Sequence, residues 1–231
     1  MNRDSLQRVG ADERERQAGF DLRLFCCSST ACKSNGAGAT VEALRQEVAS
    51  REGQSPSIEV VSTGCMGLCS RGPLARIDRK GAPSQVFHTV TPDVARAIVA
   101  HAVAPSSDGL GEHVLPADLP FFAKQMPIVL AEVGRIDPES LDDYIAHGGF
   151  IALTRALFEM TPEQVCDEIQ ASGLRGRGGA GFPTGTKWHF VRRESAPQKY
   201  VVVNGDEGDP GAYMDRTVME DNPYRVLEGM L

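Results

Sequence analysis

Residues 21–32 of the chain read DLRLFCCSSTAC, and residues 63–69 read TGCMGLC. In both places a short run suited to a β-strand leads into a pair of cysteines on a loop. Thiolates are soft ligands that suit iron–sulfur clusters and zinc, and two such loops can converge on one site. The two stretches therefore predict a metal or iron–sulfur module. The four candidate ligands are Cys27, Cys32, Cys65 and Cys69.

The spacing of the pairs, with four intervening residues in the first and three in the second, favours a [2Fe–2S] cluster. Structural zinc and merely buried or paired cysteines stay open as alternatives, because zinc also accepts closely spaced cysteine pairs. The chain shows no export signal, which argues against disulfides. Cys26 points the other way from Cys27 along an extended chain and is predicted to pack, and Cys166 is predicted to lie in a helical core face.

Working outward, the front of the chain alternates between strand and helix patterns. The predicted elements are a strand at 22–25, a helix at 37–51, a strand at 58–61, a hairpin of 74–78 with 85–90, and a helix at 91–101. This order of strands and helices is typical of a thioredoxin-like unit. We predict a flexible leader over 1–20, this domain over 21–104 and a polar linker over 105–120.

A second α/β domain is predicted over 121–231. A helix is expected to open at Asp137-Pro138, and another opens at Thr161 with the pattern of a capping box. The apolar run at 200–203 predicts a buried strand. Residues 222–231 predict a capped helix whose apolar positions are still running at the last residue, so we expect the chain to be a fragment of a longer protein.

A glycine-rich run, GLRGRGGAGFPTG, occupies residues 173–185. It contains a G-x-G-x-x-G pattern, but a helix precedes it and Pro183 follows it, so we reject a Rossmann dinucleotide fingerprint. A loop that exposes backbone N–H groups beside Arg175, Arg177 and Lys187 favours phosphate binding. A flexible surface loop is the alternative.

An acidic turn, NGDEGDPG, follows at 204–211. The side chains of Asn204, Asp206 and Glu207 could hydrogen-bond a sugar, a ribityl chain or a ring imide. A solvated acidic turn is the alternative, and calcium is a weaker one because EF-hand spacing is absent. Phe182 and Phe190 could stack on an aromatic base or pack in a core.

Composition excludes several classes of function. The 231 residues carry a formal net charge of −7 without a basic block, which argues against a nucleic-acid partner. No apolar run approaches the ~18 residues of a membrane span, and with no signal peptide the protein is predicted to be cytoplasmic. The five histidines have no catalytic or ligand spacing and are assigned no chemistry.

The glycine run with the turn NGDEGDPGAYMDR at 204–216 resembles the FMN- and NADH-binding 51 kDa subunit of respiratory complex I. The front half, with CCSSTAC at 26–32 and GCMGLCSRGPL at 64–74, resembles the thioredoxin-like [2Fe–2S] domain of the same enzymes. Their fusion in this order resembles the diaphorase large subunits of bidirectional NAD-linked [NiFe] hydrogenases.

The resemblance implies site residues and no catalytic acid or base, because FMN carries the chemistry. Asp209 stands where many relatives have glutamate. The implied FMN contacts are Gly176, Gly178, Lys187, Asn204, Asp206, Glu207 and Gly208. The implied NAD contacts are Gly179, Phe182, Lys187, Phe190 and Asp209. The implied [2Fe–2S] ligands are Cys27, Cys32, Cys65 and Cys69.

The resemblance further implies hydride transfer between NADH and FMN, followed by single-electron transfer to iron–sulfur clusters. A [4Fe–4S] cluster would belong to a cysteine motif beyond residue 231. The implied partners are a small diaphorase subunit and hydrogenase subunits in a hetero-oligomer. A flavoprotein subunit of NAD-dependent formate dehydrogenase or of a complex I-type quinone reductase is an alternative, and a non-catalytic [2Fe–2S]-binding module is an alternative of another class.

Overall fold

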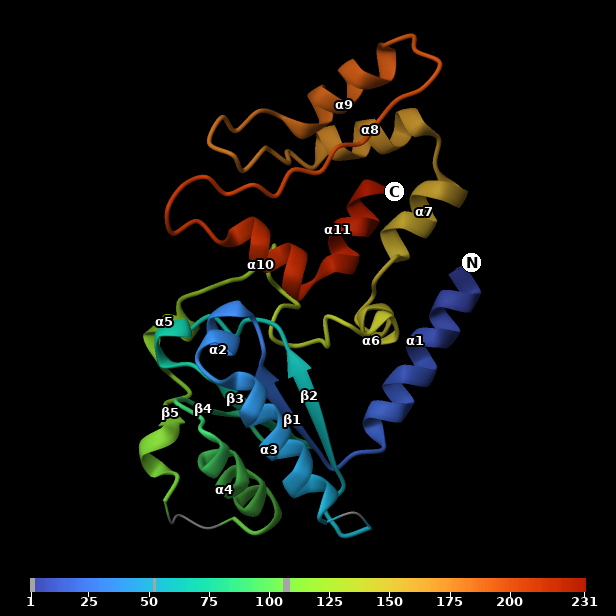
Figure 1. The fold of residues 1–231 in the computed structure, drawn as a ribbon. Helices are drawn as coiled ribbons and strands as arrows, with labels where there is room; N and C mark the ends of the chain where they lie inside the picture. The colour runs from blue at the N-terminus through green and yellow to red at the C-terminus, as the bar shows by residue number, and fades with distance from the viewer. Residues whose placement is uncertain (1–2, 52, 106–108) are drawn as a thin grey trace.

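A mixed β-sheet forms the front half of the protein in a computed structural model that describes residues 3–51, 53–105 and 109–231 (Figure 1). The strand order is β2-β1-β3-β4-β5. The β2-β1 pair is parallel and the other pairs are antiparallel. The strands are β1 (Leu22–Cys27), β2 (Ile58–Thr63), β3 (Ala75–Arg79), β4 (Gln85–Phe87) and β5 (Val114–Leu115).

The pairing of β1 with β2 decides where the cysteines lie. Leu22 is opposite Ile58 at one end of the pair, and Cys27 is opposite Thr63 at the other. Because parallel strands in register finish at the same edge of a sheet, the loops that follow them begin side by side. The two cysteine-bearing loops are those loops.

The helices of this half are α2 (Thr30–Ser34), α3 (Ala37–Ala49) and α4 (Pro92–Val103), with 3₁₀ turns at Cys69–Arg71 and Gly111–His113. Helices α3 and α4 pack together and, in Figure 1, lie next to the sheet. Their apolar side chains share one core with Leu22, Leu24 and Cys26, alternate residues of β1 that point to one face. The predicted order of strands and helices and the packing of Cys26 are confirmed.

On the other face of the sheet, the segment around 134–136 packs against the strands. Phe25 on this face is 2% exposed, and the guanidinium groups of Arg23 and Arg76 lie 4.9 and 4.3 Å from its ring centre. Arg76 also donates from Nη1 to the carbonyl of Gly134 at 2.9 Å. The hydroxyl of Thr63 donates to the carbonyl of Ile136 at 2.6 Å. These bonds fix the segment around 134–136 against the sheet.

The prediction of a flexible leader over 1–20 is wrong, because residues Arg3–Ala18 form the helix α1. Leu6 and Gly10, one turn apart, are the buried positions of this helix. Helix α1 packs against α6, where Gln17 donates to Asp143 at 2.8 Å and Arg14 donates to the carbonyl of Ala146 at 2.8 Å. With so few apolar residues the helix has no clear sequence periodicity, and its polar side chains find partners only in the tertiary structure.

The predicted linker over 105–120 is also corrected in part. Residues 106–108 lie outside the described residues, but Leu110 is 4% exposed in the core and Val114–Leu115 form β5. Val86 and Phe87 of β4 lie opposite Leu115 and Val114. Five-residue runs are the usual strand length, so a two-residue edge strand leaves little pattern to detect. The division into domains at 21–104 and 121–231 stays a prediction.

The back half is built from helices joined by long loops. The capping box at Thr161 is confirmed, and Asn222 caps the last helix as predicted. The helix predicted to open at Asp137 begins instead at Leu141, capped by the hydroxyl of Ser140. The helices are α5 (Pro120–Ala123), α6 (Leu141–Ala146), α7 (Ile151–Glu159), α8 (Pro162–Ala171), α9 (Thr184–Arg193), α10 (Met214–Asp221) and α11 (Pro223–Met230).

The strand predicted at 200–203 is not formed. These residues have no strand pairing, and the side chains of Tyr200 and Val202 are 77% and 84% exposed. A strand needs a hydrogen-bonded neighbour, and the described part of the chain places none beside this segment. The run keeps its apolar character but stays an exposed connection between α9 and α10.

The contact between α1 and α6 is expected to depend on pH through Asp143 and His147, whose side chains lie 3.2 Å apart. Hydrogen bonding to Asp143 raises the pKa of His147 above its ordinary 6.5. Burial opposes the charged form of Asp143, but hydrogen bonds from His147, the Asp137 amide and Gln17 outweigh burial and lower the pKa of Asp143 below 3.8. The stability that protonated His147 adds to this contact is fully present below pH 6.5. It is lost as the pH rises through the raised pKa of His147.

Hydrogen exchange of α1 in the whole chain checks this expectation. The amides of α1 should be better protected at about pH 5.5 than at about pH 8.5, once the intrinsic exchange rates are corrected for pH. In His147→Gln this difference should shrink, while Asp143 still holds its bonds at both pH values. An equal difference in the variant would show that His147 is not responsible.

Candidate functional site

Four cysteine side chains from two loops gather at the carboxyl ends of β1 and β2. Cys27 is the last residue of β1 and Cys32 lies in α2, while Cys65 follows β2 and Cys69 opens a 3₁₀ turn. The first two are buried, Cys65 is partly exposed and Cys69 is exposed. The site therefore reaches from the protein interior to its surface, and the register of β1 with β2 brings together all four predicted ligands.

The contacts among the thiols run both within and between the loops. The Sγ atoms of Cys65 and Cys69 lie 3.5 Å apart within one loop. The thiol of Cys27 is close enough to interact with Cys32 on its own loop and with Cys65 on the other. Cys166 lies apart from this group, 7% exposed on α8, as predicted.

The backbone around the thiols forms a cradle for a sulfur-ligated group. The amide of Gly67, at φ 93°, donates to Sγ of Cys65 at 3.3 Å. A Cβ atom at Gly72 would stand 2.8 Å from Sγ of Cys32, closer than real contacts allow. Donated N–H bonds and small residues near sulfur are what a cluster site requires. The donor set of four thiols thus fits an iron–sulfur cluster.

The surroundings raise the pKa of three of the four thiols and lower that of the fourth. Hydrogen bonding to Cys32, together with burial, raises the pKa of Cys27 to about 12, and burial raises the pKa of Cys69 to about 11. Hydrogen bonding to Cys27 raises the pKa of Cys65, whereas the same kind of bond lowers the pKa of Cys32. Because metal ligands are thiolates, loading this site must release protons.

The glycine run forms a closed loop between α8 and α9. The amide of Gly176 donates to the carbonyl of Phe182 at 2.9 Å, and the amide of Thr184 donates to the carbonyl of Leu174 at 2.9 Å. A Cβ atom at Gly178 or Gly179 would meet nothing within 4 Å, so this part of the loop is open. The backbone is accessible, as phosphate binding requires.

This loop also opens a helix, which the sequence argument against a dinucleotide fingerprint did not expect. Pro183 stands at the N-cap of α9, the position from which a chain can enter a helix without losing a needed donor. Gly185 in the first turn of α9 is buried against α8. A Cβ atom there would lie 2.3 Å from Cα of Gln170, so the close approach of the two helices requires glycine. The helix that precedes the loop is α8, so the rejection of a strand–loop–helix fingerprint stands.

Two predicted nucleotide contacts on α9 and the loop are exposed. The rings of Phe182 and Phe190 are 47% and 53% exposed, with centres 6.5 Å apart. Neither ring lies in a core, which leaves both available for stacking. Lys187 is exposed on the same helix. These residues form one accessible surface with the glycine loop.

The acidic turn lies before α10 and is partly occupied by its own hydrogen bonds. The Oδ1 atom of Asn204 accepts from the amide of Asp206 at 2.8 Å. The carboxylate of Glu207 accepts from the amides of Asp215 and Arg216 at 2.9 and 3.2 Å, which caps the start of α10. Gly208 and Asp209 are exposed. An open hollow of about 410 Å³ beside the turn is lined by Gly205, Glu207, Ala212, Tyr213, Arg216, Met219 and Glu220.

The glycine loop contributes no residue to this hollow. The structure therefore brings together the four cysteines, and it brings Phe182 and Phe190 beside the glycine loop. The hollow at the acidic turn is lined, among the described residues, without the glycine loop. The assignment of individual FMN and NAD contacts stays a prediction.

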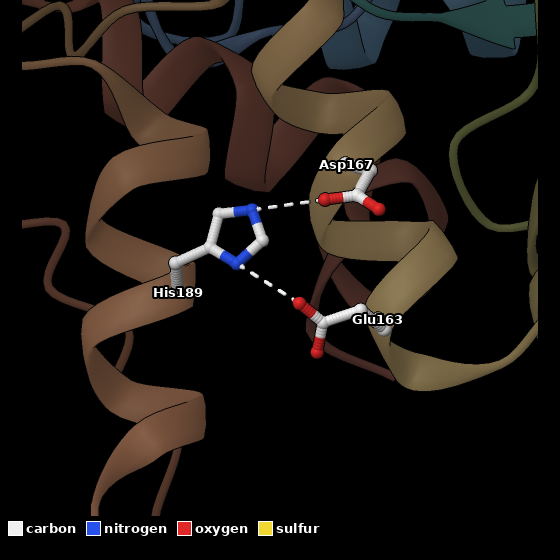
Figure 2. Close-up of side chains that lie close together, drawn as sticks. All are labelled: Glu163, Asp167 and His189. Carbon is white, nitrogen blue, oxygen red and sulfur yellow. Dashed lines mark ion pairs between the residues drawn. The ribbon is translucent and has the colours of Figure 1, made fainter.

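Figure 2 shows a histidine between two carboxylates where α8 and α9 meet. His189 faces Glu163 through Nδ1 at 3.7 Å and Asp167 through Nε2 at 3.3 Å. Arg192 forms an ion pair with the same Glu163. Although the three side chains are of metal-binding types, the arginine already balances the charge of Glu163. The group joins the two helices that flank the glycine loop, so this histidine, to which the spacing assigned no chemistry, has a structural role.

Sequence reasoning missed one buried polar residue at the cysteine site, Asp221 at the end of α10. Its side chain is among the buried polar groups, at 3% exposure, and it accepts a hydrogen bond from the amide of Cys65. A single aspartate after an amphipathic helix carries no signal of such a contact. Only the packing of α10 on the cysteine loops reveals it.

Two family comparisons match separate parts of this chain. Residues 15–102 match the family of thioredoxin-like [2Fe–2S] ferredoxins, and residues 169–231 match the Nuo51 FMN-binding domain. The chain thus carries one match to each of these two domain families. Both predicted domain classes are confirmed.

The chain is also similar to individual curated proteins. The chain is 54% identical over 107 residues to the NADP-reducing hydrogenase subunit HndC of Solidesulfovibrio fructosivorans, a match over 46% of this chain and 21% of the relative. It is 34% identical over 225 residues to the NAD-reducing hydrogenase HoxS subunit alpha of Cupriavidus necator, covering 90% of this chain and 34% of the relative.

A third relative, an NADH-quinone oxidoreductase subunit of Rhizobium meliloti, is 46% identical over 104 residues, covering 45% of this chain and 25% of the relative. The chain thus spans about a fifth to a third of the length of these curated relatives. Within the described residues, no helix is both long and apolar enough to cross a membrane.

Proposed function

We propose that this chain belongs to the large subunit of an NAD(H):acceptor oxidoreductase, a diaphorase that serves a bidirectional NAD-reducing hydrogenase. The observation that carries the proposal is the convergence of four thiols at the ends of β1 and β2, in the same chain as a Nuo51-type flavin-binding sequence. When bound, FMN would exchange a hydride with NADH, and a [2Fe–2S] cluster would carry single electrons onward.

The chain's own residues bind and orient these groups. Cys27, Cys32, Cys65 and Cys69 would hold the cluster. The backbone of Gly176 and Gly178 and the charge of Lys187 would hold phosphate, with Asn204, Asp206, Glu207 and Gly208 toward FMN. Gly179, Phe182, Phe190 and Asp209 would face the nicotinamide nucleotide. No side chain need act as acid or base, because hydride transfer to a flavin requires none from the protein.

The proposed partners are a small diaphorase subunit and hydrogenase subunits, in a cytoplasmic hetero-oligomer. The support is the hydrogenase identity of two relatives. A complex I-type quinone reductase is the rival supported by the third relative, and a formate dehydrogenase flavoprotein is a further one. Affinity purification from the native host under anaerobic conditions tests the choice. Nickel and hydrogenase activity in the purified complex would support the proposal, and their absence with quinone reductase or formate dehydrogenase activity would replace it.

A non-catalytic [2Fe–2S] module is a second candidate function. It is favoured by the separation of the glycine loop from the hollow at the acidic turn. The test is an anaerobic preparation of the chain, studied by visible absorption and by EPR after dithionite reduction, with released flavin assayed in the same sample. A one-electron [2Fe–2S] signal with FMN supports the diaphorase. The same signal without flavin supports the cluster module, and zinc without a signal contradicts both.

Replacing Lys187 should weaken the binding of FMN, because its charge is proposed to hold phosphate and not to act as a base. Loss of a charge-assisted bond to phosphate costs about 1.5 to 3 kcal/mol, so Lys187→Gln should raise the Kd for FMN by roughly ten- to a hundredfold. Fluorescence titration of FMN into the flavin-free chain measures this. Lys199→Gln, which removes another exposed cation whose Nζ donates to the carbonyl of Arg192, is the matched control. Equal Kd values for the wild type and Lys187→Gln would contradict the role of Lys187.

A further inference from the structure

The end of helix α10 is inserted between the two cysteine loops. Asp221, its last residue, accepts a hydrogen bond at Oδ2 from the amide of Cys65 at 2.9 Å. The side chain of Ser29, which lies between Cys27 and Cys32, is close enough to interact with the same carboxylate. One buried side chain from the back half of the protein therefore contacts both loops that supply the cluster ligands.

The end of α10 is in direct contact with the backbone of the second cysteine loop. A Cβ atom at Gly64 would stand 2.4 Å from Cβ of Asp221, so the backbone at 64 and the end of α10 touch directly. Around it lies an exposed set of bonds: Thr30 donates to Glu220 at 2.6 Å, and Arg216 donates to Thr30 at 2.9 Å. These outer bonds bind the same loop to the same helix, but they do not reach Cys65.

Helix α10 connects this contact to the acidic turn. Asp215 and Arg216, in its first turn, donate to the carboxylate of Glu207 in the acidic turn, and its last residue is Asp221. A short helix with both ends fixed transmits position more faithfully than a loop. The place of the predicted flavin-binding turn is thus tied, through one helix of eight residues, to the place of the thiols.

We propose that Asp221 is a positioning residue: its carboxylate holds both cysteine loops in the geometry that accepts the cluster and fixes the acidic turn relative to them. The inference rests on the proposed function only for the identity of the group that the thiols hold. Asp221 does not ligate iron, and its effect is exerted through Cys65 and Ser29.

Hydrogen exchange followed by mass spectrometry on the full chain tests whether Asp221 holds the two cysteine loops in place. In Asp221→Ala, amides in both 26–34 and 60–70 should exchange faster by on the order of tenfold, because a buried hydrogen bond to a charged group is lost. Asp221→Asn keeps an acceptor for the Cys65 amide and should restore most of the protection of 60–70. Glu220→Gln removes the same charge one residue earlier without touching Cys65 and should leave that segment unchanged.

Cluster behaviour provides the second readout. In the reconstituted chain, Asp221→Ala should lose its [2Fe–2S] absorbance to a chelator on the order of tenfold faster than wild type, with a changed EPR line shape, and Asp221→Asn should fall between them. If Asp221→Ala does not fold, Ser29→Ala tests the contact with the first cysteine loop alone. It should speed the hydrogen exchange of 26–34 but not that of 60–70.

The proposal would be overturned if Asp221→Ala left the exchange of both segments, or of 26–34 alone, unchanged. It would also be overturned if Glu220→Gln raised the exchange of 60–70 as much as Asp221→Ala does. If the wild-type chain takes up no cluster, the proposed function fails, whereas the exchange experiment still decides the role of Asp221. The two failures are therefore distinguishable.

Discussion

Replacing Cys65 by alanine is expected to abolish the [2Fe–2S] absorbance and EPR signal of the reconstituted chain. Cys65 lies 3.5 Å from Cys69 and is close enough to interact with Cys27, so it sits where both loops meet. A cluster held by four thiolates loses one of its few strong bonds when any ligand is removed, and alanine offers no replacement donor. The measurement is iron and sulfide content with EPR after dithionite reduction.

Cys166→Ala is the matched control for this experiment. It removes a buried thiol on α8, well away from the cysteine loops, and the signal should remain. Cys26→Ala is a more demanding control, because Cys26 adjoins Cys27 but points into the helix-covered core. A full signal in Cys65→Ala, or its loss in Cys166→Ala, would be incompatible with the assigned ligand set.

Replacing Phe87 by alanine is expected to cost about 3 to 5 kcal/mol of unfolding free energy. Phe87 is fully buried in the core shared by the sheet, α3 and α4, and its truncation leaves a cavity that the surrounding side chains cannot fill. Urea denaturation followed by far-ultraviolet circular dichroism measures the change. Because small domains have only about 5 to 15 kcal/mol to lose, this variant should be marginal at room temperature.

Phe190→Ala provides the comparison, since the same atoms are removed from a ring that is 53% exposed. Its stability should change by no more than about 0.5 kcal/mol, as for other surface positions. Binding of NADH by the flavin-loaded chain should weaken instead, if the ring stacks on the nucleotide. A large loss of stability would mean that Phe190 is a core residue after all.

The fold of the front half followed from local patterns. Alternation in Leu22–Phe25, helical spacing in the segment from 37 and the hairpin pattern from 74 each predicted an element that the structure contains. The grouping of the four cysteines was predictable because cysteine is chemically distinctive and its spacing is short. Helix α1 and strand β5 were not predictable, since one has few apolar residues and the other has two residues.

The segments predicted to bind FMN and NAD also had some features that the sequence revealed and others that it did not. The glycine run and the acidic turn were visible because their composition is unusual, but the sequence did not show that Glu207 caps α10 or that Phe182 and Phe190 are exposed. The run at 200–203 has strand propensity, and whether it becomes a strand depends on a neighbour that local sequence does not supply. The residue types predicted a strand, and the lack of a paired neighbour among the described residues left the segment a loop.

By itself, then, the sequence determined the kinds of chemistry available: thiols in two pairs, an accessible glycine backbone and a carboxylate-rich turn. Only the tertiary structure decided which of these groups meet. The parallel register of β1 with β2 brings Cys27 and Cys65 to one edge, and the packing of α10 places Asp221 between their loops. Short-range patterns record backbone and residue preferences, whereas contacts between distant segments arise from packing that no single segment encodes.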